Sequence, residues 1–241
     1  MGRRAAPSGP PGATTKGEGA KARIRAAADT LFAERGLAGV SAQDLATAAG
    51  VTKAAVFYYY DGMAALHAEV LDGYYRAHEE ALRGALDRPG TLAERLHGTL
   101  DAYLDFISAN TRYARMVQRQ VAGASEGADL EVVRRNLAGL LRAVEAALGP
   151  AAPSEGPMAP RHLFVTLSGA VINYFTYAPV LEAAWGRDPR SAAAVAERRA
   201  HLPWVVDALL AALGAQAGGG SVGGVEGVEP ASSARTARRY K

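Results

Sequence analysis

The chain has 241 residues, nearly half of them hydrophobic, which is enough to bury a globular core. It contains no apolar run near the roughly 20 residues that cross a bilayer, and its first residues lack the apolar stretch of a signal peptide, so we expect a soluble, cytoplasmic protein. Cysteine is absent, which excludes disulfides and thiolate metal sites.

Charge is distributed unevenly along the chain. Six basic residues against Glu18 give residues 1–25 a formal charge of +5, and the last seven residues carry +4. The overall charge of +3 therefore leaves residues 26–234 at −6. A basic end beside an acidic body indicates contact with nucleic acid, because Lys and Arg displace counterions from phosphates. On charge alone, basic tails that only maintain solubility are an equal alternative.

The ends of the chain differ in composition from its middle. Residues 1–17 are rich in Gly, Pro, Ala and Ser without apolar periodicity, which predicts a disordered basic arm. Residues 214–241 contain two glycine runs and predict a flexible basic tail. Between them, apolar residues recur at helical spacing, and no alternating β-branched runs flank a hairpin turn. We therefore predict an all-α fold of about nine helices.

The first predicted helix carries an apolar stripe that ends where Gly36 can take the left-handed closing conformation. The stripe comprises Ile24, Ala27, Ala28, Leu31 and Phe32.

The next segment is typical of two short helices joined by a tight turn. Ser41 can cap the first helix, and Gly50 permits the turn that follows it. Thr52 can cap the second helix, which we expect over residues 53–60. Residues 41–60 thus predict a helix-turn-helix, a motif whose second helix can lie in the major groove of DNA.

Three segments of this region resemble the DNA-binding domain of the TetR family of regulators, namely Leu31–Gly36, Asp44–Lys53 and Val56–Tyr60. The resemblance covers roughly Lys21 to Leu71, and its ordered spacing makes it more specific than a bare glycine motif. It implies a three-helix DNA-binding domain at residues 18–63, whose third helix enters the major groove. It also implies a ligand-binding and dimerisation domain at residues 64–213.

The resemblance and the side-chain chemistry together assign DNA contacts to eight residues. Gln43 can read adenine or bond a phosphate, Lys53 can reach guanine or the backbone, and small alanines allow close approach. The eight are Arg23, Gln43, Thr52, Lys53, Ala54, Ala55, Phe57 and Tyr58. For Arg23, a solvated helix face is an equal alternative.

The sequence departs from the family pattern at two places. Phe57 stands where the family usually has a phosphate-binding tyrosine, and Tyr58 is the candidate to replace it. Gly62 and Met63 stand where the family commonly has a capping Ser and a phosphate-binding Lys. We assign Tyr60 to the core of the domain, because aromatic residues that close such a helix usually pack there.

Further amphipathic helices are predicted at residues 64–86, 92–108, 112–122, 130–148, 161–184 and 191–213, and the first of them, which includes His78, is expected to connect the two domains. The resemblance implies that the middle helices enclose an apolar cavity for a small-molecule effector. Seven polar-tipped or adaptable residues are candidates for its wall, with ordinary core packing as the alternative for each. They are Tyr103, Phe106, Tyr113, Met116, Gln120, Asn173 and Tyr177.

The last two predicted helices each carry an apolar stripe that, by the resemblance, pairs with a second copy of the chain. The first stripe comprises Leu163, Leu167, Val171, Tyr174 and Ala178; the second comprises Leu202, Val206, Leu209, Leu210 and Leu213. The alternative is that both stripes form the core of a single chain. Pro203 predicts a kink or a late start in the last helix.

These features predict a ligand-responsive repressor that binds a pseudo-palindromic operator as a homodimer. We expect no cofactor and no metal, since His78 and His162 lack partners at metal-ligand spacing. Gly123–Gly127 matches the nucleophile elbow of hydrolases without the strand that such an elbow needs, which argues against an enzyme. A helical interaction or small-molecule-binding protein of the same fold, with weak or no DNA binding, is the alternative.

Overall fold

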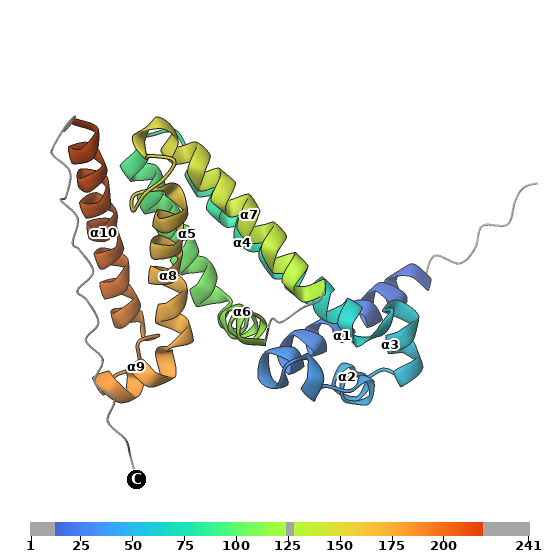
Figure 1. Ribbon diagram of the computed structural model, residues 1–241. Helices are drawn as coiled ribbons and strands as arrows, with labels where there is room; N and C mark the ends of the chain where they lie inside the picture. Colours follow the sequence, from blue (N-terminus) through green and yellow to red (C-terminus); the bar gives the residue numbers. More distant parts are fainter. Residues whose placement is uncertain (1–12, 124–127, 219–241) are drawn as a thin grey trace, which may run out of the picture.

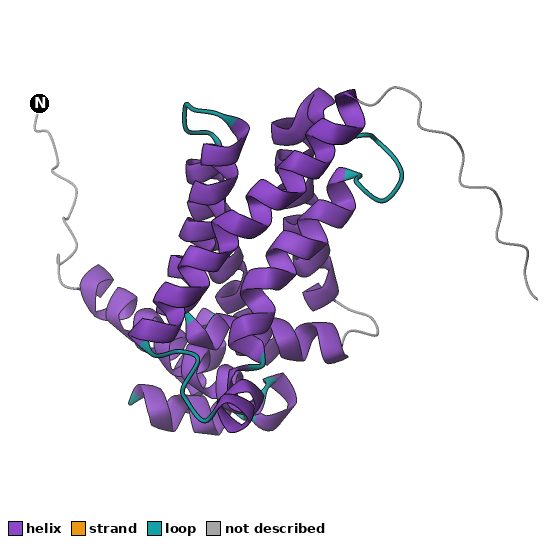
Figure 2. Ribbon diagram, turned by 90° about the vertical axis from the view of Figure 1, so that its left-hand side faces the viewer, coloured by secondary structure: helices purple, strands orange, loops and turns teal. Residues whose placement is uncertain are grey.

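The computed structural model describes residues 13–123 and 128–218, and within these ranges every regular element is helical (Figure 2). The α-helices are α1 (Ala13–Arg35), α2 (Ala42–Ala49), α3 (Lys53–Tyr59), α4 (Gly62–Leu86), α5 (Leu92–Ala109), α6 (Thr111–Gly123), α7 (Ala128–Leu148), α8 (Pro160–Thr176), α9 (Ala178–Trp185) and α10 (Ala192–Gly218). Two short 3₁₀ helices lie at Leu37–Gly39 and Gly149–Ala151. The predicted all-α fold is confirmed.

The helices α1, α2 and α3 gather at one end of the molecule (Figure 1), around the N-terminal part of the hydrophobic core, called here the small core. Its centre is formed by side chains that are almost completely buried, namely Ile24, Phe32, Leu45, Val56 and Leu66. Leu66 belongs to α4, so the first turns of that helix close the small domain. Burial of one such side chain stabilises the fold by about 1.5–3 kcal/mol, which short helices cannot obtain alone.

The larger body is built around α4, which lies alongside α5 and α7 (Figure 1). Helix α10 packs on α5, and ion pairs connect the two helices along their length. Arg199 contacts both Asp101 and Asp105, and the His97 imidazole lies 2.8 Å from the Asp207 carboxylate. These contacts hold the outermost helix against the centre of the body.

The single helix predicted over residues 161–184 is wrong, because the structure has two helices that meet at Tyr177 with a bend of 71°. Pro179 lies in the first turn of α9. A proline there has no N–H to donate to the preceding turn, and its ring clashes with the carbonyl four residues before it, so α8 stops and α9 restarts.

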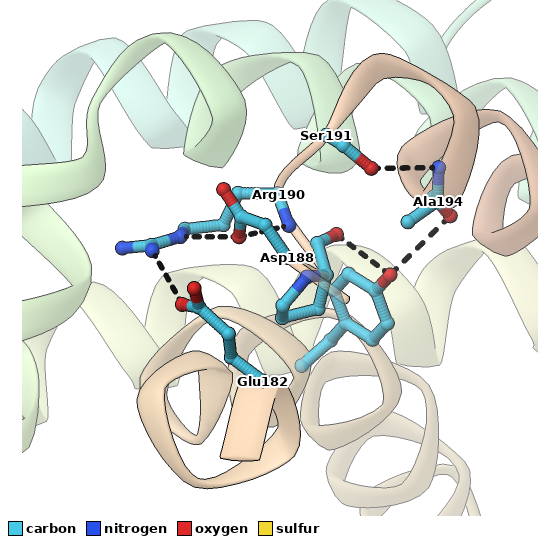
Figure 3. A network of polar contacts seen from close by, with 7 residues as sticks. Glu182, Asp188, Arg190, Ser191 and Ala194 are labelled. Carbon is cyan, nitrogen blue, oxygen red and sulfur yellow. Dashed lines mark hydrogen bonds and ion pairs between the residues drawn. The ribbon is translucent and has the colours of Figure 1, made fainter. Parts of the chain in front are cut away.

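The connection from α9 to α10 is fixed by a polar network (Figure 3). The Arg190 guanidinium contacts Glu182 of α9 at 3.2 Å and Asp188 of the loop at 2.9 Å. The Asp188 carboxylate also accepts from the Arg190 backbone N–H, which lowers the pKa of Asp188. The Ser191 hydroxyl accepts from the Ala194 N–H and so begins α10. The network therefore connects α9 to the first turn of α10.

The ends of the helical region lie outside the predicted limits. Helix α1 begins at Ala13, five residues before the expected boundary at 18, and α10 continues to Gly218, past the expected end at 213. Pro203 lies inside α10 without delaying its start.

The two stripes predicted to pair with a second copy are instead core of the single chain. All five members of the first stripe are buried, and in α10 Leu202, Val206 and Leu213 are buried while Leu209 and Leu210 pack partly on the core. Helices α8 and α10 each have a second apolar face, which includes the exposed side chains of Val165 and Trp204. The stronger apolar face of each helix is therefore the one that packs on the rest of the body.

In the part of the chain that the structure describes, no helix taken alone has the length and apolar character to cross a membrane. The bent pair α8 and α9 passes the length and composition criteria only when the two are taken together.

The left-handed backbone at Gly50 lets us predict how two glycine substitutions change the free energy of unfolding. Its φ of +63° and ψ of +43° are left-handed, so Gly50→Ala should lower the free energy of unfolding by about 1 kcal/mol. Gly84 in α4 has open space around its Cα, and Gly84→Ala should raise the same quantity by about 0.5–1 kcal/mol. Urea unfolding at one fixed protein concentration measures both. Equal effects of the two substitutions would contradict the assignment.

Candidate nucleic-acid interface and ligand cavity

Helix α2 begins with a reciprocal pair of hydrogen bonds. The Ser41 hydroxyl accepts from the Asp44 N–H at 3.1 Å, and the Asp44 carboxylate accepts from the Ser41 N–H at 2.9 Å. The hydroxyl also donates to that carboxylate at 2.6 Å, and these bonds from Ser41 lower the pKa of Asp44. Such a capping box satisfies backbone donors that the first turn of a helix leaves free.

The turn to α3 uses Gly50 and a second cap. The left-handed Gly50 closes α2, and the Thr52 hydroxyl then accepts from the Ala55 N–H at 3.2 Å. The turn is therefore short, and after Gly50 it reaches the next helix in two residues, Val51 and Thr52. This is the helix-turn-helix that the sequence predicts.

The start of α3 is open to solvent. Thr52, Lys53 and Ala54 are exposed and Ala55 is half-buried, whereas Val56 is buried in the small core. An α3 face free of other protein side chains is what entry into a DNA groove requires.

The exposed face continues along α3 in steps of four residues. Phe57 follows Lys53 and is 52% exposed, while Tyr58 follows Ala54 and is 82% exposed. Aromatic side chains so exposed have little packing reason to be there, and the DNA contacts assigned to Phe57 and Tyr58 stay a prediction. On α2, Gln43 is exposed as well.

Tyr60 lies in the core of the domain, as we expected. Its hydroxyl is 3.5 Å from the Glu69 carboxylate, and the Lys21 ammonium lies 5.4 Å from its ring centre. Burial raises the pKa of Tyr60 to about 12. This tyrosine joins α1, α3 and α4.

Arg23 makes a contact inside the domain. Its Nε donates to the carbonyl of Ala49 at 3.1 Å, which satisfies an acceptor at the end of α2. The side chain therefore fixes α1 against the helix-turn-helix, a role that the sequence did not reveal.

The body contains an apolar cavity of about 220 Å³ between α4, α5, α6, α7 and α8. Most of its wall is aliphatic, and Leu82, Leu100 and Leu140 are representative. Its buried polar groups belong to Tyr75, His78, Tyr103 and Tyr113 and to the small side chain of Thr99.

The structure separates the seven residues predicted for the wall. Tyr103 and Tyr113 line the cavity. Phe106 stacks behind His78 with ring centres 5.2 Å apart, and Met116 is buried in the core outside the wall. These two residues support the cavity or the core without lining the wall.

Asn173 and Tyr177 do not reach the cavity, so the prediction that they line it is wrong. Helix α8 turns Phe164, Leu167 and Ile172 toward the cavity, so Asn173 falls on the exposed side, and Tyr177 stands at the exposed bend. The side chain of Gln120 lies outside the described residues.

Sequence reasoning missed Tyr75 as part of the wall and treated His78 only as part of a connector. The signal that could have found them is the spacing of Leu71, Tyr75, His78 and Leu82, which places all four on one face of α4. That face passes from the small core into the cavity.

Helix α6 connects the cavity to the small domain. Tyr113 lines the cavity, and the adjacent Arg112 contacts the Asp29 carboxylate of α1 at 2.9 Å. Asp29 also accepts from the Tyr74 hydroxyl at 2.5 Å, and burial together with this bond raises the pKa of Tyr74. Two turns further along α6, Arg119 donates to the Glu34 carbonyl at 2.8 Å.

Comparison with known proteins agrees with these features. The sequence profile of bacterial regulatory proteins of the tetR family matches residues 24–70. The HTH-type transcriptional repressor KstR2 of Rhodococcus jostii (strain RHA1) is 30% identical over 118 residues, which are 47% of this chain. The matched part spans 58% of the length of that repressor.

Solved structures share the fold at low identity. The fatty acid degradation regulator FadR from Bacillus halodurans has a TM-score of 0.57 and 17% identity, over 80% of this chain and 97% of that one. The transcriptional regulator FadR from Bacillus subtilis in complex with stearoyl-CoA has the same TM-score and coverage and 15% identity. These structures show the fold of the chain, and the profile match shows that residues 24–70 resemble the DNA-binding segment of bacterial regulatory proteins of the tetR family.

Proposed function

We propose that this protein is a ligand-responsive transcriptional repressor, located in the cytoplasm, that binds operator DNA as a homodimer. The observation that carries the proposal is the open start of α3, where Thr52, Lys53 and Ala54 are exposed in a helix-turn-helix that is capped at both helices. Their side chains can reach base edges and phosphates in the major groove. The KstR2 relative is a repressor, which favours repression over activation.

The dimer surface in this proposal is the outer face of α8, α9 and α10. Val165 and Val180 are each about two-thirds exposed, and Trp204 is 68% exposed. Trp185 is about half exposed. Large apolar side chains exposed on three consecutive helices are typical of an interface with a second copy. A twofold dimer would set two α3 helices about 34–36 Å apart, one turn of DNA.

The route from cavity to DNA in this proposal runs through α4 and α6. Both helices line the cavity, and both contact α1, α6 through Arg112 and Arg119. A ligand that favours another position of α6 would shift the small domains of the dimer and change their spacing. A coupling of about 1–3 kcal/mol would weaken operator binding some 5- to 150-fold.

A second candidate, a protein of this fold without DNA binding, is favoured by two features. Phe57 offers no hydroxyl for a phosphate, and Asp61, which precedes α4, makes no capping hydrogen bond with its side chain among the described residues. The salt dependence of DNA binding distinguishes the repressor from a protein without DNA binding, because an affinity that depends on phosphate contacts falls steeply as the salt concentration rises.

Lys53→Ala tests the interface. We expect it to weaken binding to the DNA that flanks its own gene by about tenfold and to reduce the salt dependence, because a single side chain on a base or phosphate contributes about 1–3 kcal/mol. Arg88→Ala is the matched control, since Arg88 is an exposed cation in the loop between α4 and α5. Fluorescence anisotropy at several salt concentrations measures both. An unchanged affinity for Lys53→Ala would refute the assignment.

Trp204→Glu tests the dimer surface. A carboxylate in the centre of an apolar interface would lose its hydration, so we expect this variant to be monomeric at micromolar concentration. Arg142→Glu places the same group on α7, away from the proposed surface, and should leave the mass in solution unchanged. Analytical ultracentrifugation distinguishes the two. A dimeric Trp204→Glu variant would show that the interface lies elsewhere.

A further inference from the structure

Two residues that line the cavity each carry a buried polar atom without a protein partner. Tyr75 Oη and His78 Nε2 are fully buried, and no group in the described part of the chain hydrogen-bonds to either. The two residues are three apart on α4 and therefore lie on one face of that helix, one turn from each other. A buried polar group without a partner costs free energy, and such groups in folded proteins call for a bound molecule or another explanation.

The orientation and charge of His78 are fixed by its surroundings. Its ring stacks on Tyr103 and Phe106 at 4.5 and 5.2 Å between centres, and its Nδ1 lies 3.3 Å from the Tyr113 hydroxyl. Burial lowers the pKa of His78 to about 4, so the imidazole is neutral at pH 7. Burial also raises the pKa of Tyr75, so its phenol keeps its proton and can donate.

The one charged side chain among those that line the cavity is already paired. Among the lining side chains, the only charged one is Arg83, whose Nε is already 2.8 Å from the Glu79 carboxylate and which is half exposed. A carboxylate or an ammonium inside the cavity would lose its hydration without gaining a paired ion.

The volume limits the size of the ligand. An apolar cavity of about 150 Å³ holds benzene, so about 220 Å³ accommodates on the order of nine non-hydrogen atoms. That is much smaller than stearoyl-CoA, the molecule bound by the Bacillus subtilis regulator.

We propose that the effector is a small, uncharged, mainly hydrocarbon molecule with one carbonyl or hydroxyl oxygen, which Tyr75 and His78 hold by hydrogen bonds. This proposal rests on the proposed function and names the ligand class of its cavity. A carbonyl oxygen accepts from the Tyr75 hydroxyl and from His78 Nε2–H, the tautomer in which Tyr113 donates to Nδ1. A hydroxyl accepts from Tyr75 and donates to Nε2 in the other tautomer.

Four probes of similar length test the ligand class on the full-length protein at pH 7.5: 2-octanone, 2-octanol, octane and octanoate. By isothermal calorimetry we expect the ketone or the alcohol to bind at least about tenfold more tightly than octane, and octanoate to bind most weakly. Whether the ketone or the alcohol binds more tightly identifies the tautomer of His78. Octanoate as tight as the ketone, a ketone and an alcohol no tighter than octane, or no binding of any probe would overturn the proposal.

Substitutions of Tyr75 and His78 test whether these side chains hydrogen-bond to the ligand oxygen. Tyr75→Phe removes one hydroxyl and should weaken binding of the preferred oxygen-containing probe about tenfold without changing that of octane. His78→Phe should do the same and serves as the second test where Tyr75→Phe does not fold. Tyr59→Phe makes the same change outside the cavity and should leave all four affinities unchanged. A preference for the oxygen probe that survives both cavity substitutions would refute the roles of Tyr75 and His78.

The same samples separate this proposal from the function on which it rests. Operator binding by the unliganded protein is measured in parallel. If operator binding persists while the probes fail, only the ligand class is wrong; if operator binding is absent, the proposed function itself fails.

Discussion

The burial of one face of α4 in two different cores is the constraint on which the rest of the structure depends. Leu66 and Val70 complete the small domain, and Leu82 and Leu86 complete the body. Because a helix transmits displacement along its axis, neither core can be rearranged around α4 without a consequence for the other. The helix-turn-helix and the cavity lie in different parts of the molecule, but α4 connects them, so a displacement at one is transmitted to the other.

The same helix explains why the cavity wall is polar at one place. Between the apolar residues of its two ends, the buried face of α4 carries Tyr75 and His78. Leucine at both positions would satisfy packing alone. The aromatic cluster formed by Tyr103, Phe106 and Tyr113 holds the imidazole of His78 in one orientation. The direction of its ring nitrogens is therefore fixed.

Local signals in the sequence were sufficient for the small domain. Ser41, Gly50 and Thr52 act through bonds to residues within five positions of each, so their roles could be predicted before any tertiary contact was known. The chemistry of α3 followed from its exposed residue types. The capping and turn contacts join residues that are close in sequence, so the order of residue types is enough to predict them.

The parts that the sequence did not predict depend on long-range packing. Helix α8 has two apolar faces, and the face with Leu163 and Val171 packs on α5 and α7 of the same chain. Periodicity shows that both faces are apolar, but it does not show which of them packs inside the chain and which is left for a second chain. The wall residues were misplaced for the same reason, since the register of α8 toward the cavity is set by its neighbours. The bend at Tyr177 is different, because Pro179 is a local signal in the sequence that predicts a break in the helix.

The bond between Arg119 and the Glu34 carbonyl has one more consequence. In the last turn of α1, the Glu34 carbonyl accepts from Arg119 of α6, 85 residues away in the sequence. The helix-turn-helix domain is thus linked to the body at the end of α1 as well as through α4. A chimera that grafts residues 13–61 onto an unrelated sensor would lose Leu66 from its core, so it needs the first turns of α4. Water can replace the exposed donors from α6, but the graft would lose the connection to the sensor that they provide.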